Sequence, residues 1–136
     1  MLKKQPFDLR NSIIADMAQH NELGKAGEEI ALKHLRKLGY NILAVNWYYG
    51  HEEVDIIAMD GKTLVIAEVK TRAGNDFGEP EFAVNKRKQK SIVRVADAYI
   101  QENDLDVETR FDVISVIIKS GDKQLHHIED AFYPTM

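Results

Sequence analysis

Two neighbouring segments, 53–59 and 64–70, are apolar at most positions on both sides of the strand alternation. Segments of this kind are typical of central strands that are covered on both faces of a sheet. Asp60-Gly61 lies between them and is a strong signal for a tight reversal of the chain. The pattern therefore predicts a β-hairpin at the centre of the protein.

The segments around this hairpin predict a mixed α/β arrangement. Apolar residues at helical spacing favour one helix on each side of it, and segments rich in β-branched and aromatic residues favour three further strands. In chain order we expect a helix at 23–38, a strand at 40–49, a polar, mobile loop at 71–80, a helix at 82–102, and strands at 111–119 and 124–129. This order predicts a single α/β domain with a mixed central sheet flanked by helices.

Helical periodicity predicts which side chains face the core. The inward positions are Ala31, Leu32, Leu35 and Leu38 in the first helix, and Ile92, Val95, Ala96 and Tyr99 in the second. The same criterion separates two adjacent glutamates. Glu28 shares its side of the helix with Leu32 and Leu35, whereas Glu29 aligns with cations on a solvated side.

The chain has 136 residues, enough for one domain with a proper core. It has no cysteine, which excludes disulfides and thiolate metal sites. Neither a signal-peptide pattern nor a membrane-length apolar run is found, so we expect a cytoplasmic protein without a membrane partner. Residues 1–20 are expected to be an N-terminal extension with a short helix at 11–19, ahead of a domain at 21–136. Met17 would serve as an alternative start, which makes the first sixteen residues dispensable.

The net charge of -4 argues against a protein that coats nucleic acid nonspecifically. The charge is unevenly distributed, however. Residues 62–94 hold eight of the 18 Lys+Arg and four of the 22 Asp+Glu, a local balance of +4 that leaves -8 for the remainder. An acidic body with one basic stretch is compatible with a nucleic-acid enzyme.

Three charged residues interrupt the apolar hairpin: Asp55, Glu68 and Lys70. Ionised groups in buried strands are costly unless they are paired or hold a metal. With a two-residue turn Asp55 lies opposite Ile66 and diagonal to Glu68, and with a four-residue turn the two carboxylates are directly opposite. Either turn puts both carboxylates on one face of the sheet, and Lys70 shares that face because it lies two positions after Glu68.

Two carboxylates at this spacing suit Mg²⁺ or Mn²⁺. The protein ligands would be Asp55, Glu68 and the backbone carbonyl of Val69, with waters completing an octahedral set. Such an ion can activate a water and neutralise charge on a phosphodiester. Lys70 could orient that water, and Glu28 could reach the ion or the water from the first helix.

Motifs in and around the hairpin resemble known nucleases. Asp55 followed by Glu68-Val69-Lys70 resembles the D…ExK signature of restriction-endonuclease-like nucleases. A larger set resembles the YraN-like family, a group of uncharacterised bacterial proteins similar to archaeal Holliday-junction resolvases. Over about residues 20–130 these motifs are Gly24-Lys-Ala-Gly27-Glu28-Glu-Ile-Ala31, Gly39-Tyr40, Asn46-Trp47, Glu53-Val-Asp55-Ile-Ile-Ala58, Glu68-Val-Lys70-Thr-Arg72 and Ala83-Val84…Lys88-Gln89.

The resemblance implies a restriction-endonuclease-like core and a predicted endonuclease activity, which we expect to act on DNA and at branched or junction structures. Asp55, Glu68 and Lys70 match the core motif, and Glu28 matches the helical glutamate. Two residues of this chain depart from the usual family pattern, Glu52 in place of a small residue and Tyr48 in place of arginine. The expected nucleic-acid contacts are Lys88, Gln89, Arg72 and Arg87.

Simpler interpretations stay open. Asp55 and Glu68 could be charges at the sheet rim or ion-pair partners of Lys70. Glu28 could be favoured only by the helix dipole, and Lys88 could cap its helix. The remaining hypotheses are a metal-dependent endonuclease, a non-catalytic nucleic-acid-binding module of the same fold, and a protein-interaction domain. A homodimer with two sites would suit junction cutting, by analogy alone.

Overall fold

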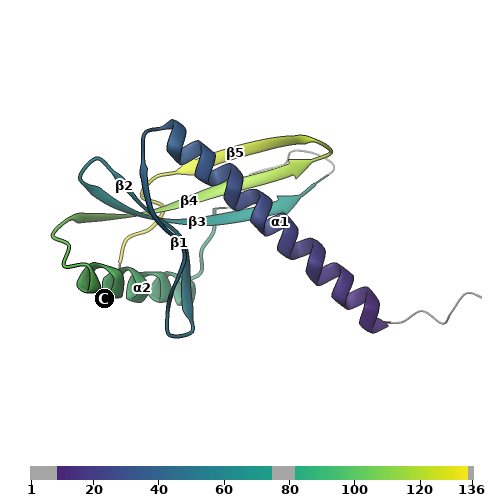
Figure 1. The fold of residues 1–136 in the computed structure, drawn as a ribbon, viewed down its shortest axis with the longest axis horizontal. Coiled ribbons are helices and arrows are strands. Elements are labelled where there is room, and N and C mark those ends of the chain that lie inside the picture. The colour runs from purple at the N-terminus through teal and green to yellow at the C-terminus, as the bar shows by residue number, and fades with distance from the viewer. Residues whose placement is uncertain (1–8, 75–81, 135–136) are drawn as a thin grey trace, which may run out of the picture.

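The structure is a computed structural model that describes residues 9–74 and 82–134, with side chains from residue 17 onward. The described part of the chain forms two helices and five strands (Figure 1). Their bounds are α1 (Leu9–Lys37), β1 (Asn41–Tyr49), β2 (Glu52–Asp60), β3 (Thr63–Ala73), α2 (Lys86–Glu102), β4 (Glu108–Lys119) and β5 (Asp122–Ile128).

The strands form one mixed sheet in the order β1-β2-β3-β4-β5. Neighbouring strands are antiparallel, except that β3 and β4 are parallel and are joined through the crossover helix α2. The predicted hairpin, β2 and β3, therefore includes the central strand. The predicted α/β class with a mixed central sheet is confirmed, and the arrangement is compatible with a restriction-endonuclease-like core.

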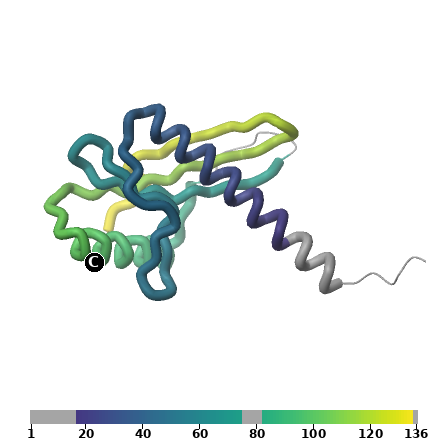
Figure 2. Tube along the Cα trace, in the orientation of Figure 1, coloured from purple at the N-terminus to yellow at the C-terminus, as the bar shows by residue number. Residues whose placement is uncertain are grey.

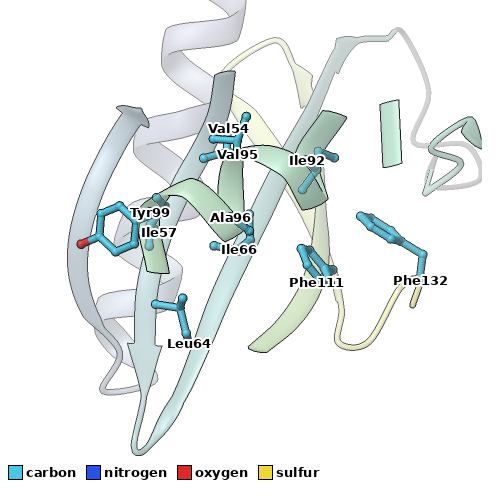
Figure 3. Packing of buried hydrophobic residues seen from close by; sticks show 10 residues of the cluster. All are labelled: Val54, Ile57, Leu64, Ile66, Ile92, Val95, Ala96, Tyr99, Phe111 and Phe132. Atoms are coloured by element: carbon cyan, nitrogen blue, oxygen red, sulfur yellow. The ribbon is translucent and has the colours of Figure 1, made fainter. Parts of the chain in front are cut away.

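The two helices cover opposite faces of this sheet. On one face, α2 packs against side chains of β2 and β3 such as Ile57 and Leu64 (Figure 3). The buried residues of α2 are the four that periodicity predicts: Ile92, Val95, Ala96 and Tyr99. On the other face, Ala31 and Leu35 of α1 lie against alternate strand residues such as Val65. Because both faces are covered, the central strands are apolar at nearly every position.

α1 is longer than the apolar pattern indicates. It is one helix of 29 residues, so the segments predicted as separate helices at 11–19 and 23–38 are continuous (Figure 1). Figure 2 shows the helix without a break over its coloured part, from residue 17 onward. The predicted boundary between residues 20 and 21 falls inside it. Residues 17–22 are exposed, and an exposed stretch of helix carries no apolar periodicity. Neither helix, over the described residues, combines the length and apolarity needed to cross a membrane.

The prediction that Leu38 faces the core is wrong. Leu38 is 54% exposed, because α1 ends at Lys37 and the chain then reverses at Gly39, which has a φ of +89°. The predicted loop at 71–80 also begins too early, since β3 continues to Ala73. Residues 75–80 of that loop lie outside the described residues.

The β2–β3 turn is shifted by one residue from its predicted place. Asp60 pairs with Thr63, so the loop residues are Gly61 and Lys62. Gly61 has a φ of +58°, a conformation that favours glycine. The shift changes the register to the one expected for the longer turn, in which Asp55 lies level with Glu68.

Candidate functional site

The candidate site lies where β2 and β3 separate. Their backbone ladder ends at Ile56 and Ala67, and the next pair in this register is Asp55 and Glu68. The Oδ2 atom of Asp55 accepts a hydrogen bond of 2.8 Å from the N–H of Val69. A side chain thus takes the place of a ladder partner, which fixes this carboxylate in the gap between the strands.

A break in the alternation of β2 turns Asp55 toward this gap. Val54 and Ile57 both belong to the core on the α2 side, although they are three positions apart. Asn46 of β1 lies opposite Asp55 in the register and has a φ of 51°. Asparagine tolerates this left-handed conformation better than most residues. In the sequence, Asn46 stands out only as part of a motif, and its position beside an expected site strand is the signal that could have singled it out.

Glu68 is buried in surroundings that disfavour its charge. It is 9% exposed, and its Oε1 atom has no hydrogen-bond partner among the described residues. Burial and then the neighbouring Asp55 charge raise the pKa of Glu68 far above its usual range, and the charge of Lys88 offsets this only partly. A bound cation would relieve such a pair of carboxylates.

α1 brings Glu28 to the other side of Asp55. A Cβ at Gly27 would clash with the Oγ1 atom of Thr71, so only glycine lets the helix approach β3 this closely. Burial and the Asp55 charge raise the pKa of Glu28, against a hydrogen bond from Asn46 that lowers it. Its Oε1 atom is also buried without a partner among the described residues.

Two small hollows meet at Val69. The first has a volume of about 260 Å³ and is lined by Glu28 and Asp55 on the α1 side. The second has a volume of about 200 Å³ and is lined by Glu68 and Lys70 on the α2 side. The carboxylates therefore meet at the gap between the strands and open onto two sides of the sheet, rather than sharing one flat face.

The head of α2 lies beside the second hollow. Asn85 caps the helix by accepting a hydrogen bond of 2.8 Å from the N–H of Lys88, whose side chain lines the hollow beside Glu68. The Nε2 atom of Gln89 donates to the carbonyl of Val84 at 2.7 Å and lines a different hollow. The structure thus brings Lys88 to the carboxylates and does not bring Gln89 there.

The other predicted contacts lie further out. Arg87 is exposed and lines a neighbouring hollow together with Lys88. Arg72 is exposed near the end of β3 and lines neither hollow at the carboxylates. Arg94 is neutralised by Glu52, with its Nε atom 3.1 Å from Oε2. This ion pair gives a structural role to Glu52, one of the two departures from the family pattern.

The donor set at the strand gap fits a hard divalent cation. Its atoms are oxygens, from the carboxylates of Asp55 and Glu68 and the carbonyl of Val69, with Glu28 nearby. The unpartnered oxygens of Glu28 and Glu68 favour the same chemistry. Over the described residues, no group of three or more His, Cys, Asp or Glu side chains is placed to hold a metal ion. An ion held here would therefore keep several waters, as Mg²⁺ commonly does.

A second buried polar cluster lies between α1 and the sheet. Asp112 of β4 is fully buried, with Arg110 Nε at 2.9 Å and His127 Nε2 at 2.8 Å from its oxygens. His127 also contacts His34 of α1, with the Nδ1 atom of His127 lying 3.0 Å from the Nε2 atom of His34. Burial works to raise the pKa of Asp112, but hydrogen bonds from His127 and Arg110 outweigh it and hold this pKa below its usual value. The sequence patterns did not predict this cluster, although the charges of Arg110 and Asp112 at alternate positions of an apolar strand were a signal for it.

Known proteins resemble this chain along most of its length. Residues 27–116 match the model of the uncharacterised protein family UPF0102. A UPF0102 protein of Bacteroides thetaiotaomicron is 50% identical over 120 residues, which cover 88% of this chain and 99% of the relative. A UPF0102 protein of Christiangramia forsetii is 47% identical over 117 residues, which cover 86% of this chain and 98% of the relative. A UPF0102 protein of Porphyromonas gingivalis is 47% identical over 118 residues, which cover 85% of this chain and 87% of the relative. Their names state no activity.

Proposed function

Because the chain belongs to the uncharacterised protein family UPF0102, whose name assigns no activity, we propose its function from the site: a metal-dependent endonuclease that acts on DNA. Its substrates would be phosphodiester bonds at branched or junction structures, and its cofactor Mg²⁺ or Mn²⁺. The observation that supports this most is the pair of neighbouring carboxylates, Asp55 and Glu68, together with the buried Oε1 atom of Glu68, which has no hydrogen-bond partner among the described residues. The motifs shared with restriction-endonuclease-like nucleases support the same chemistry.

Each residue of the site has a role in this proposal. Asp55, held by the N–H of Val69, and Glu68 would bind the ion together with the Val69 carbonyl. The bound ion would neutralise charge on the phosphodiester and activate a water. Lys70 lines the hollow of Glu68, where its ammonium would stabilise negative charge developing on the phosphate. Glu28 would accept a hydrogen bond from the attacking water on the α1 side.

Exposed cations at the head of α2 would contact the phosphates that flank the reacting one. Lys88 lies beside Glu68, and its neighbour Arg87 lines the next hollow, further from the carboxylates. Arg94 is excluded from this role because Glu52 already neutralises it. Arg72 and Gln89 are left without a direct place at the reacting phosphate.

Cleavage assays on linear, flapped and four-way DNA with Mn²⁺ or Mg²⁺ test the proposal. We expect cleavage by the wild type and a loss of about 10²-fold or more for Asp55→Asn and for Glu68→Gln, because each removes a charged ligand. Glu29→Gln is the matched control, since this exposed carboxylate adjoins Glu28 and lies outside the hollows.

Two outcomes would reject the nuclease assignment. Cleavage retained by Glu68→Gln would trace the activity to a contaminant or another site. Binding of DNA without cleavage by the wild type would favour the alternative, a non-catalytic nucleic-acid-binding module of the same fold.

A further inference from the structure

A groove between α1 and β5 carries a concentration of positive charge. Its volume is about 530 Å³, larger than either hollow at the carboxylates. Its cations are Lys33, Arg36 and Lys37 of α1 and Lys123 of β5, and no carboxylate lines it. We call it the α1–β5 groove. The structure records no ion pair between these cations and a carboxylate of the described residues.

The helix dipole accounts for only part of this charge. Arg36 and Lys37 belong to the last turn of α1, where cations are favoured by the C-terminal end of the dipole. Lys123 lies on a different element, across the groove, outside the last turn of α1 where the effect of that dipole is largest. Cations on two facing elements, with no carboxylate lining the groove between them, oppose folding through their mutual repulsion. A polyanion bound between them would remove that repulsion.

The rest of the lining suits one strand of nucleic acid better than a duplex. Ile30 and Leu125 provide apolar surface for a sugar or a base. His34 also lines the groove, and its ring is held in place by the hydrogen bond to His127. Imidazole rings can stack on unpaired bases. The volume lies within the range of about 300–1,000 Å³ that takes small ligands, so the groove has room for nucleotide units of a strand.

The α1–β5 groove is separate from the candidate catalytic site. Glu28 lies on the flank of α1 that faces β2, and Ile30 and His34 lie on the flank that faces β5. α1 itself therefore stands between the groove and Asp55. A nucleic-acid strand bound in the groove would therefore lie on the other side of α1 from the carboxylates.

We propose that the α1–β5 groove binds a single nucleic-acid strand through its phosphodiester backbone, as a second contact beside the catalytic site. The choice of nucleic acid among polyanions rests on the proposed function. The choice of groove rests on its charge, its apolar lining and its size.

The test uses the full chain in EDTA and measures binding of fluorescent oligo-thymidine of about 20 nucleotides by anisotropy, across a range of salt concentrations. The variants are Lys37→Glu and Lys123→Glu, both exposed groove positions. The matched control is Lys62→Glu, which makes the same charge change in the β2–β3 turn, at the opposite end of the sheet from Lys123. We expect each groove variant to bind about three- to tenfold more weakly and to lower the salt slope by about one, with the control near wild type.

Three results would overturn this proposal: equal binding by all variants, equal weakening in the control, or equal competition by polyglutamate of matched charge, which would indicate an acidic polypeptide. The outcome is independent of catalysis because EDTA removes the metal. A protein that binds oligo-thymidine in this groove but cuts no DNA with Mn²⁺ would disprove the nuclease and leave the groove assignment standing. If the wild type cuts DNA and the groove variants bind oligo-thymidine as well as the wild type, the groove assignment is disproved and the nuclease proposal stands.

Discussion

At the scale of single residues, burying Glu68 beside Asp55 lowers the stability of the metal-free protein, because the ionised carboxylate is disfavoured there. In metal-free buffer at pH 7, folding must either desolvate its charge beside Asp55 or take up a proton. Glu68→Gln keeps the shape and removes this cost, so we expect it to raise the free energy of unfolding by about 1 kcal/mol. Urea denaturation in EDTA measures this difference.

The same variant should lose its response to metal. Mn²⁺ that binds the folded wild type raises its melting temperature by mass action, and Glu68→Gln removes a ligand. Glu29→Gln should keep the full response, because its carboxylate is exposed on the solvated side of α1. An equal Mn²⁺ shift in Glu68→Gln and wild type would show that the ion binds elsewhere.

Asp112 makes the opposite contribution to stability. Its ion pair with Arg110 is buried, and breaking such a pair costs about 3 kcal/mol because the partner is left uncompensated. We therefore expect Asp112→Asn to lower the free energy of unfolding at pH 7 by about that amount. Asp106→Asn, at an exposed position, should change it little.

The pH dependence of this loss has a definite sign. The pKa of Asp112 in the folded protein lies below the ordinary 3.8, so the ionised form contributes stability above that pH. The contribution is lost as the pH falls through the folded pKa. Urea denaturation at pH 7 and at pH 3 should show the gap between wild type and Asp112→Asn shrinking at the lower pH. A gap that is constant or grows would contradict the proposed ion pair.

At the scale of elements, the approach of α1 to β3 positions Glu28. Gly27 permits this approach because a Cβ there would strike Thr71. We expect Gly27→Ala to lower the free energy of unfolding by about 2 kcal/mol, in the range for overpacked contacts. It should also weaken Mn²⁺ binding, since α1 would shift away from Asp55.

Gly24 offers a control one turn earlier on the same helix. A Cβ at Gly24 meets no atom within 4 Å, so Gly24→Ala should stabilise the protein by about 0.5–1 kcal/mol through helix propensity. Thermal denaturation of both variants checks the pair. Similar effects of the two substitutions would show that the helix does not press on β3 at Gly27.

At the scale of the whole molecule, both helices depend on one sheet. Trp47, the single tryptophan, lies on β1 and its ring is 5.1 Å from that of Tyr99 on α2. Tryptophan fluorescence therefore reports the α2 face, while far-UV circular dichroism reports α1 and α2 together. We expect the two signals to give coincident urea transitions, with a slope of about 1–3 kcal/mol/M. Separated transitions would show that α1 unfolds independently.

The sequence was informative wherever the relevant contacts are local. The four buried residues of α2 follow from a period of 3.6 residues, and the strand positions and the α/β class follow from local runs of apolar, β-branched and aromatic residues. The pattern failed at α1, because an exposed part of a helix has no apolar period. It also failed by one residue at the β2–β3 turn, where the register depends on pairing along the whole hairpin.

The sequence by itself determined that Asp55, Glu68 and Lys70 interrupt buried strands, since that conflict can be read from the residues alone. Only the tertiary structure decided that Asp55 occupies the gap where the strands part, that Gly27 brings Glu28 beside it, and that Asp112 lies in a buried cluster. It also decided that Lys37 and Lys123 face one groove. These residues are far apart in the chain, and their distances are set by how two helices pack on a twisted sheet, which no local pattern specifies.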